Sequence, residues 1–425
     1  MTSTPTAPLP TGPADSSGPQ TTDAADLEGR SEFSVPSHIR PLREAVLRFM
    51  TEHVEPVEAD LDAGTPAARE LLRTLQAEAA AQGLWALGHP AEIGGGGLPF
   101  LDYVYINEIQ GRSEFGQYAL GTWTLQDSLM LHRHAVGPCR DRFLGPLVAG
   151  EAWPSFAMTE PDVASSDPTT LQTTARLVDG HWRIEGRKWF ITNAGDAAFT
   201  TVLCRTEDDA PPHRSFSLIL VPTDTPGYRV VRETPALGLR GGHFEIELDG
   251  VEVPEDHLIG DRGAGFAIAQ ERLGPGRIFH AMRWLGQAQR AFELMCSRLN
   301  SRMLSGSPLG ERQLMQQHVF ESWSSIWASR LLTLDAASRI DRGHGARAEI
   351  GALKVVGARM LHDVVDRALQ VHGAAGLSDD TPLSRMYRAA RFARIYDGAD
   401  EVHVVNVARR LLRDHDNGEP WDFGA

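Results

Sequence analysis

The hydrophobic period changes twice along this chain, and that order of segments limits the fold more than any other feature. From position 36 to about 150, apolar residues recur at steps of three and four, as at Ile39, Leu42 and Val46, which marks one face of a helix. Between about 170 and 260 the period falls to two, and the pair Asp179-Gly180 separates two alternating runs as in a β-hairpin. After position 263 the helical steps return.

These changes predict an α+β fold with helices first, then a small barrel or sandwich of short antiparallel strands, then a bundle of long helices. The expected units are a disordered tail at 1–30, a helical domain at 31–152, a β domain at 153–262 and a helical bundle at 263–425. The tail is expected to be disordered because it consists mainly of Thr, Ser, Pro, Ala and acidic residues, without the apolar core of a signal peptide.

Charge and cysteine content exclude several classes of function. A net charge of −15 with no basic patch argues against a nucleic-acid partner. No apolar run approaches the roughly 20 residues of a membrane span. The three cysteines, Cys139, Cys204 and Cys296, lack the spacing of a metal site or a disulfide framework. The cysteine pattern therefore predicts a cytoplasmic protein without a disulfide framework, and we expect no bound metal. Arginine supplies nearly all of the positive charge, with lysine only at Lys188 and Lys354, and a GC-rich bacterial genome favours this composition.

The segment 156–167, FAMTEPDVASSD, lies where the helical period ends and the strand period begins. Its backbone N–H groups and the hydroxyls of Thr159 and Ser166 can hydrogen-bond the polar edge of a flat ring system. An ordinary loop between a helix and a strand, with Asp and Ser in turn positions, accounts for the same residues. This segment alone leaves both interpretations open.

A second segment, KWFITN at 188–193, follows the hairpin. Phe190 and Thr192 are two positions apart, so on a strand they point to the same side, where one could cover a flat ring and the other could bond it. The alternative is an aromatic core residue beside a surface threonine.

Two further segments end helices. In QVHGAAG at 370–376, Gly373 is typical of a turn that terminates a helix. In YDG at 396–398, the Asp397 carboxylate could cap the helix that follows.

These segments resemble those of the acyl-CoA dehydrogenase family, and the resemblance covers about residues 36–414. The family's A-M-T-E-P-x-A-G-S-D matches 157–167 with one inserted residue and Ser165 in place of glycine, and its K-x-W-I-T-N matches 188–193 with Phe190 in place of tryptophan. Its Q-x-x-G-G-x-G matches 370–376, with Ala374 in place of the second glycine.

The family's Y-E-G, which carries the catalytic glutamate, matches 396–398 with Asp397 in its place. Some branches carry the base just before an arginine that matches Arg277, but Gly276 stands there, which leaves Asp397 as the base. The stretches 272–283 and 397–403 are most similar to the branch whose large animal members carry an added kinase-like domain and which also uses an Asp base.

The resemblance implies an N-terminal helical domain, a middle antiparallel β-barrel domain and a C-terminal four-helix bundle, with FAD between the last two. Its motifs assign FAD contacts to Phe156, Met158, Thr159, Ser166, Phe190, Thr192, Arg302, Gln313, Gln370 and Gly373. In the family the last four serve the cofactor of a neighbouring subunit, so a homodimer or homotetramer is implied. Ser305 stands where the family has phenylalanine after the matching arginine.

The activity implied is α,β-desaturation of an acyl thioester, in which Asp397 takes the α-proton and the β-hydride passes to flavin N5. The motifs assign substrate contacts to Ser166, Arg277, Asp397 and Gly398. Electron-transfer flavoprotein is the acceptor implied. A dry pocket should raise the pKa of the Asp397 carboxyl.

Three other readings share the fold. A nitroalkane oxidase-like enzyme or a monooxygenase would also use an aspartate, but such oxidases pair it with an arginine at the position of Val404. An acyl-carrier-protein-specific dehydrogenase of secondary metabolism would act on a carrier-bound thioester instead of acyl-CoA. A flavin-binding paralogue without activity would not need the carboxylate of Asp397.

Overall fold

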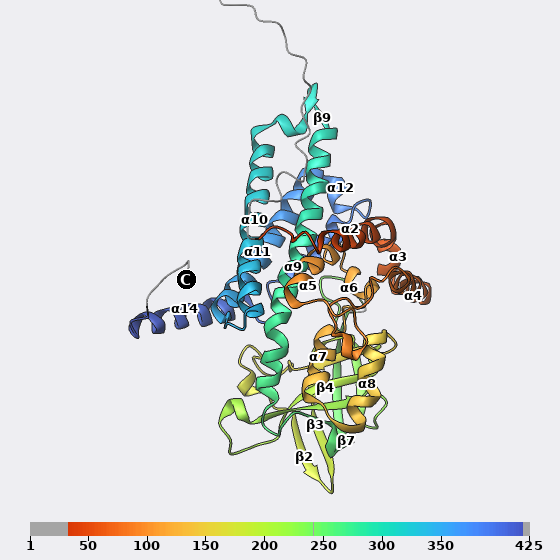
Figure 1. Ribbon diagram of the computed structural model, residues 1–425, viewed down its shortest axis with the longest axis vertical. Helices are drawn as coiled ribbons and strands as arrows, with labels where there is room; N and C mark the ends of the chain where they lie inside the picture. Colours follow the sequence, from red (N-terminus) through yellow and green to blue (C-terminus); the bar gives the residue numbers. More distant parts are fainter. Residues whose placement is uncertain (1–32, 241, 420–425) are drawn as a thin grey trace, which may run out of the picture.

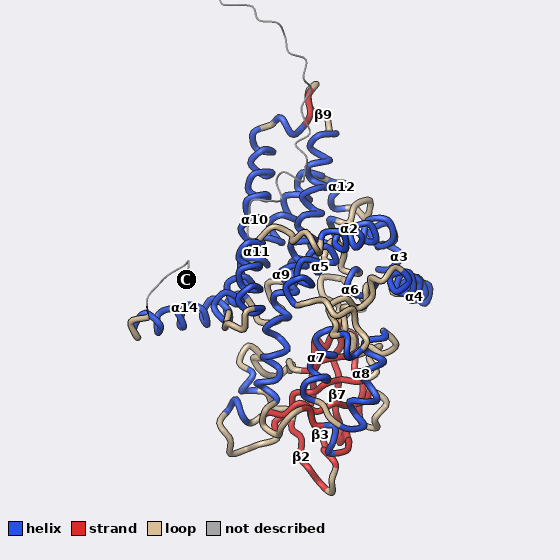
Figure 2. The backbone as a smooth tube through the Cα atoms, viewed as in Figure 1, coloured by secondary structure: helices blue, strands red, loops and turns tan. Residues whose placement is uncertain are grey.

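The structure, a computed structural model, describes residues 33–240 and 242–419, and the expected tail at 1–30 lies outside them. Helices lie at both ends of the described chain with a sheet between them, as the change of period predicted (Figure 1, Figure 2). Within those residues, no helix is both long and apolar enough to cross a membrane.

The helices before the sheet pack around one nearly buried helix, α5. They are α2 (Arg40–Phe49), α3 (Glu58–Asp62), α4 (Pro66–Ala81), α5 (Phe100–Gln110), α6 (Gly116–Ala119), α7 (Leu125–His134) and α8 (Gly137–Ala149). Helix α4 starts at Pro66 because the Thr65 hydroxyl accepts a hydrogen bond from the Ala68 N–H and proline favours the first helical turn. Every residue of α5 from position 103 to 110 is buried.

The middle of the chain forms one eight-stranded sheet. Its strands are β1 (Pro154–Ala157), β2 (Thr174–Val178), β3 (His181–Thr192), β4 (Phe199–Arg205), β5 (Phe216–Pro222), β6 (Tyr228–Glu233), β7 (His243–Pro254) and β8 (Leu258–Ile259). Asp179 and Gly180 both have positive φ, 49° and 77°, which is the tight reverse turn expected between β2 and β3.

The strand pairing differs from the expected antiparallel barrel. The order β6-β7-β3-β2-β4-β5-β8 is an open path, and both β1 and β2 pair with β4 in parallel. The β2–β3 hairpin lies between β1 and β4 in the chain, and this long connection allows β4 to return in the direction of β1. The period of a sequence reports the presence of strands but not their relative direction, so the expectation of wholly antiparallel pairing was wrong.

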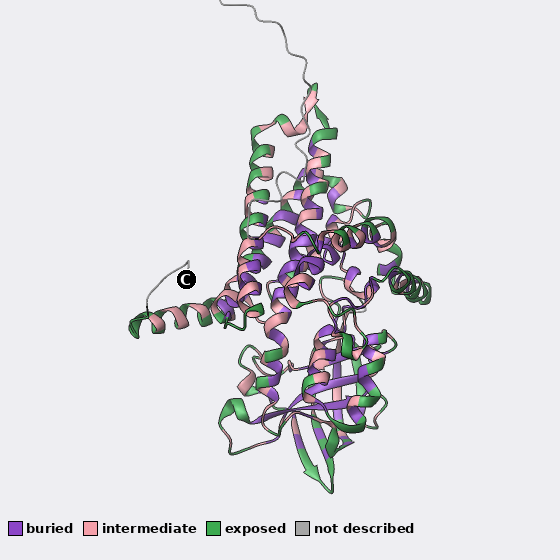
Figure 3. Ribbon diagram, in the orientation of Figure 1, coloured by how far each residue is buried: buried purple, intermediate pink, exposed green. Residues whose placement is uncertain are grey.

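The helices after the sheet are α9 (Gly265–Ser301), α10 (Gln313–Asp341), α11 (Arg347–His372), α12 (Ala374–Leu377), α13 (Leu383–Phe392) and α14 (Asp400–Asp416). Their buried faces meet around α9, α11 and α5 (Figure 3). At about 1.5 Å per residue, the 37 residues of α9 extend about 55 Å, from the sheet to a small hairpin of β9 (Met303–Leu304) and β10 (Ser307–Pro308). Helix α14 projects from the body of the molecule (Figure 1).

A buried carboxylate joins the two helical regions. Both Glu108 oxygens lie in the core, where the carboxylate accepts hydrogen bonds from Arg330 (2.9 Å), Gln289 (2.6 Å) and Arg43 (3.5 Å). Burial alone would raise the pKa of Glu108, but Arg330 and Arg43 lower it below its ordinary value. The carboxylate therefore holds helices α2, α5, α9 and α10 together as an ion.

Replacing this carboxylate should destabilise the fold strongly. In Glu108→Ala, the buried Arg330 guanidinium loses its counter-ion, so we expect the free energy of unfolding to fall by about 3–5 kcal/mol. In the control Glu70→Ala, the lost partner is the exposed Arg73, and the expected change is about 0–1 kcal/mol. Urea unfolding measures both, and equal effects of the two variants would contradict the role of Glu108.

Candidate active site

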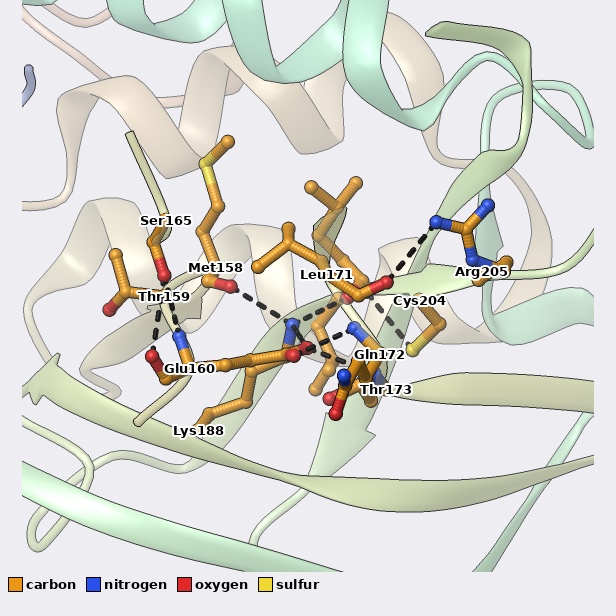
Figure 4. A network of polar contacts seen from close by, with 12 residues as sticks. Met158, Thr159, Glu160, Ser165, Leu171, Gln172, Thr173, Lys188, Cys204 and Arg205 are labelled. Atoms are coloured by element: carbon orange, nitrogen blue, oxygen red, sulfur yellow. Dashed lines mark hydrogen bonds and ion pairs between the residues drawn. The ribbon is translucent and has the colours of Figure 1, made fainter. Parts of the chain in front are cut away.

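The two polar segments singled out in the sequence are joined by one buried lysine. The Lys188 ammonium donates to the carbonyl of Met158 (3.0 Å), the carbonyl of Leu203 (2.8 Å) and the Glu160 carboxylate (2.9 Å) (Figure 4). The same carboxylate accepts from the backbone N–H groups of Gln172 and Thr173. The loop after β1 is thereby fixed on β3 and β4.

Glu160 stays ionised in this setting. Burial opposes its ionisation, but the Lys188 charge and the two backbone donors lower the pKa of the Glu160 carboxyl. Both partners are nearly inaccessible to solvent, so the pair is a structural element of the site rather than a group that meets a ligand.

The backbone turns the Phe190 ring out of the sheet. Phe190 has a φ of 53°, which is unusual for a bulky residue, and it lies where the register of β3 and β7 shifts between Lys188 and Ile191. Its side chain is 46% exposed. The Thr192 hydroxyl lies 3.1 Å from Nδ1 of His243, and the Phe190 ring borders the same imidazole. The structure therefore brings Phe190 and Thr192 together, although a bulge rather than simple alternation sets their directions.

The loop after β1 uses part of its hydrogen-bonding capacity within the protein. The Thr159 hydroxyl donates to the Trp189 carbonyl at 2.5 Å, so only its oxygen lone pairs remain for a ligand. Ser166 is exposed, and among the described residues its hydroxyl has no hydrogen-bond partner. The Phe156 ring is half-buried beneath the Arg272 guanidinium, at 4.5 Å, and Met158 gives its carbonyl to Lys188.

Asp397 lies in a tightly held turn between α13 and α14. Asp397 and Gly398 both have positive φ, 53° and 99°, and aspartate is one of the few residues with a side chain that adopts this region readily. The Asp397 carbonyl accepts from Arg277 Nε (3.2 Å) and lies 3.1 Å from His403 Nε2. The Lys354 ammonium donates to the carbonyls at both ends of the turn, those of Ala393 and Gly398.

The Asp397 side chain does not cap helix α14. Helix α14 begins after Ala399, and no side chain caps it. The Asp397 carboxylate instead faces α9, where its Oδ2 lies 3.0 Å from Nε2 of His280, and 23% of the side chain is exposed.

The expected direction of the Asp397 pKa was wrong. Burial does raise it, but the close approach of His280, at 3.0 Å, and the charges of Arg277 and Arg272 outweigh burial and hold the pKa well below its usual range. His280 was missed in the sequence. Because Arg277, His280 and Arg283 are spaced by three along α9, they share one helix face, and that spacing could have indicated it.

Three details of the turn bear on chemistry. Among the described residues, no backbone carbonyl accepts from the Asp397 N–H, so this donor is available to a ligand. A Cβ on Gly398 would lie 2.6 Å from His403, so the position excludes a side chain. A Cβ on Gly276 would lie 2.0 Å from Gln126 Nε2, so a carboxylate there would have to displace Gln126.

The remaining expected cofactor residues lie far from this cluster within one chain. Arg302, Gln313, Gln370 and Gly373 are all exposed, and they lie at the end of the long helices remote from the sheet (Figure 1). Helix α9 separates Arg302 from the sheet by about 55 Å at about 1.5 Å per residue. One chain therefore does not bring the ten residues together.

Comparison with known proteins places every part of this architecture in one family. Three family models match, described as acyl-CoA dehydrogenase N-terminal domain (residues 37–151), middle domain (155–251) and C-terminal domain (263–412). "Probable acyl-CoA dehydrogenase FadE2" of Mycobacterium tuberculosis is 43% identical over 398 residues, which cover 90% of this chain and 97% of that protein.

An animal relative and a solved bacterial structure are also similar to this chain. "Acyl-CoA dehydrogenase family member 11" of Rattus norvegicus is 37% identical over 389 residues, and the chain spans 50% of that longer relative. A solved acyl-CoA dehydrogenase from Geobacillus kaustophilus superposes with a TM-score of 0.79 at 26% identity, covering 88% of this chain and 98% of that one.

Loss of the buried ammonium should loosen the β domain. In Lys188→Met the Glu160 carboxylate stays buried without its counter-ion, so we expect a loss of about 3–5 kcal/mol in the free energy of unfolding. The matched double variant Lys188→Met with Glu160→Gln removes both charges and should recover part of that loss. Urea unfolding compares the two, and a double variant no more stable than the single one would contradict an ionised pair.

Proposed function

Since the chain belongs to the acyl-CoA dehydrogenase family, whose members are oxidoreductases that act on CH–CH groups, we propose that it desaturates an acyl thioester between its α and β carbons. Asp397 is the proposed base for the α-proton. The observation that carries the proposal is the fixed, ionised carboxylate of Asp397, in a chain whose alternative base position is Gly276.

FAD is the proposed cofactor, and residues of this chain fit it. The Phe190 ring is held in solvent by a strained backbone, which suits stacking on a flat ring system, and the Ser166 hydroxyl is free of protein partners among the described residues. Phe156, Met158, Thr159 and Thr192 would complete its surroundings in the same subunit. The flavin would supply the two-electron acceptor for the β-hydride.

Proton abstraction requires a base and a hydrogen-bond donor for the thioester carbonyl, and the residues around Asp397 are proposed to supply both. A carboxylate with a lowered pKa is ionised at neutral pH but is a weak base, and an α-proton is far less acidic, so the negative charge that develops on the thioester carbonyl must be stabilised. The unpaired Asp397 N–H is the proposed donor for that carbonyl oxygen. Arg277, Gly398 and Ser166 are the other proposed substrate contacts.

A second copy of the chain is the proposed source of the remaining cofactor contacts. Arg302, Gln313, Gln370 and Gly373 are exposed, and they lie at ends of the long helices, whereas Phe190 lies on the sheet. Helix α10 also exposes Phe320, Trp323 and Trp327, and the two indole rings stack at 6.4 Å. Large exposed aromatic residues on one helix are typical of a protein interface, so we propose a homodimer or homotetramer.

The redox partner and the compartment are proposed by analogy with relatives, of which a bacterial one is 43% identical to this chain. We propose electron-transfer flavoprotein as the electron acceptor and the cytoplasm as the location. Both acyl-CoA and a carrier-bound thioester satisfy the proposed chemistry, because each presents the same carbonyl and α-carbon to Asp397.

Asp397→Asn should abolish proton abstraction while preserving the site. Asparagine accepts the positive φ of this position, so the turn should stay intact, and FAD content and acyl-CoA binding should be unchanged. Reduction of the bound flavin by a panel of acyl-CoAs, followed anaerobically in a stopped-flow spectrometer, should slow by at least about 10²–10⁴-fold. The control Asp379→Asn changes an exposed carboxylate and should match the unmodified protein. Undiminished reduction in Asp397→Asn would remove Asp397 from the mechanism.

Association and FAD retention should fall together. Glutamate at Trp323 and Trp327 places charges on the exposed face of α10, so the double variant should dissociate and should lose FAD. The control Leu177→Glu charges an exposed apolar position on β2 and should do neither. Sedimentation with absorbance detection measures both quantities, and an FAD-saturated monomer of 46.5 kDa would contradict the shared site.

A further inference from the structure

His280 is held in one orientation beside the proposed base. It lies on α9 one turn after Arg277, and its Nε2 is 3.0 Å from Oδ2 of Asp397. The imidazole packs against the Tyr396 ring (centroids 4.9 Å apart) and stacks on the Trp284 indole (6.1 Å). Because two aromatic rings restrict the imidazole, the direction of Nε2 is set by packing.

The contact of the other ring nitrogen, Nδ1, determines which tautomer His280 adopts. Arg283 Nη2 lies 2.9 Å from Nδ1, and a guanidinium can only donate hydrogen bonds, so Nδ1 must be the acceptor. The single proton of the neutral imidazole is then on Nε2, the ring nitrogen that lies 3.0 Å from Oδ2 of Asp397. Burial and the Arg283 charge also lower the pKa of His280, which keeps the ring neutral.

We propose that His280 is a positioning residue for Asp397: its Nε2–H holds Oδ2, and Arg283 selects the tautomer that makes this possible. This inference rests on the proposed function of Asp397 as the base. Among the described residues, none donates a hydrogen bond to Oδ1, so this oxygen is the one that remains to accept the α-proton. The carboxylate is thus held by one oxygen and reacts through the other.

Other charged groups also face the pair, so His280 sets only part of the local potential. Arg272 and Arg277 approach from α9, Lys354 from α11 and His403 from α14, and the Tyr396 phenol lies beside them. Within the described chain none of these groups forms a hydrogen bond or an ion pair with the Asp397 carboxylate, whereas His280 lies 3.0 Å from its Oδ2. A variant at His280 therefore changes the orientation of the carboxylate while most of the surrounding charge remains.

Two variants separate hydrogen bonding from packing. His280→Phe keeps a ring between Trp284 and Tyr396 but has no donor, whereas His280→Gln offers an amide N–H in place of Nε2–H. We expect flavin reduction by acyl-CoA to slow by about 10²-fold in His280→Phe with little change in substrate affinity, because a misplaced base costs about that much. His280→Gln should restore most of the rate.

The pH dependence gives a readout that packing alone would not move. The hydrogen bond lowers the pKa of Asp397, so its loss raises that pKa and should shift the acidic limb of the rate profile to higher pH in His280→Phe. Arg283→Met frees Nδ1 for a second proton and removes one of the causes that lower the pKa of His280, so at acidic pH an imidazolium should hold the carboxylate more tightly and slow the reaction more than in the unmodified protein.

A measurement without substrate tests the same contact. In the native state His280 stays neutral, whereas the unfolded imidazole takes up a proton below about pH 6.5, so His280 favours the unmodified protein more at pH 7 than at pH 4. The contribution of Asp397, whose pKa is lowered, is lost only below its unfolded pKa of about 3.9 and is nearly the same at both pH values. The difference in melting temperature between the unmodified protein and His280→Phe should therefore be larger at pH 7.

The outcomes distinguish this inference from the proposed function. If His280→Phe keeps the rate and pH profile while Asp397→Asn is inactive, the positioning role is overturned and the proposed function stands. If Asp397→Asn remains fully active, the proposed function fails. A melting-temperature difference that is the same at pH 4 and pH 7 would overturn the neutral state of His280 on which the positioning role depends, whatever the reaction.

Discussion

The buried ammonium of Lys188 is the interaction on which the β side of the site depends. The Lys188 side chain is inaccessible to solvent, so protein oxygens must accept its hydrogen bonds. Those oxygens belong to the loop after β1, to β4 and to Glu160. The segment that contains Thr159 and the segment that contains Phe190 are thus fixed relative to one another before any ligand binds. Leaving either charge alone in the core costs several kcal/mol, which makes this geometry hard to distort.

The second side of the site depends on the length of α9. One rigid helix carries Gly265 against the backbone of β5, the face with Arg277, His280 and Arg283 against the Asp397 turn, and Arg302 at its far end. Because these positions belong to one helix, the spacing between the Asp397 turn and the sheet is set by helical geometry. The same helix places Arg302 about 55 Å from the sheet of its own chain, which is why the proposed cofactor contact of Arg302 requires a second copy.

Sequence patterns predicted the features that depend on local periodicity, such as the order of helices and strands. They failed for features that depend on tertiary contacts, such as strand direction and the Asp397 pKa. The order of helices, strands and helices and the Asp179-Gly180 turn were predicted, and the family resemblance is confirmed. The parallel pairings with β4 were not predictable, because strand direction depends on the whole connection. The Asp397 pKa was predicted in the wrong direction because burial was considered without His280, which is distant in sequence and adjacent only after folding.

The burial of both lysines also affects how readily acyl thioesters can acylate the folded protein. Thioesters acylate exposed primary amines, and most proteins present many lysines to such attack. Here the only two lysines, Lys188 and Lys354, are both fully buried with their ammonium groups directed at backbone carbonyls. Arginine supplies the surface cations and is far less nucleophilic because it stays protonated. A protein proposed to handle acyl thioesters therefore has no lysine side chain that its own substrate could modify without first unfolding it.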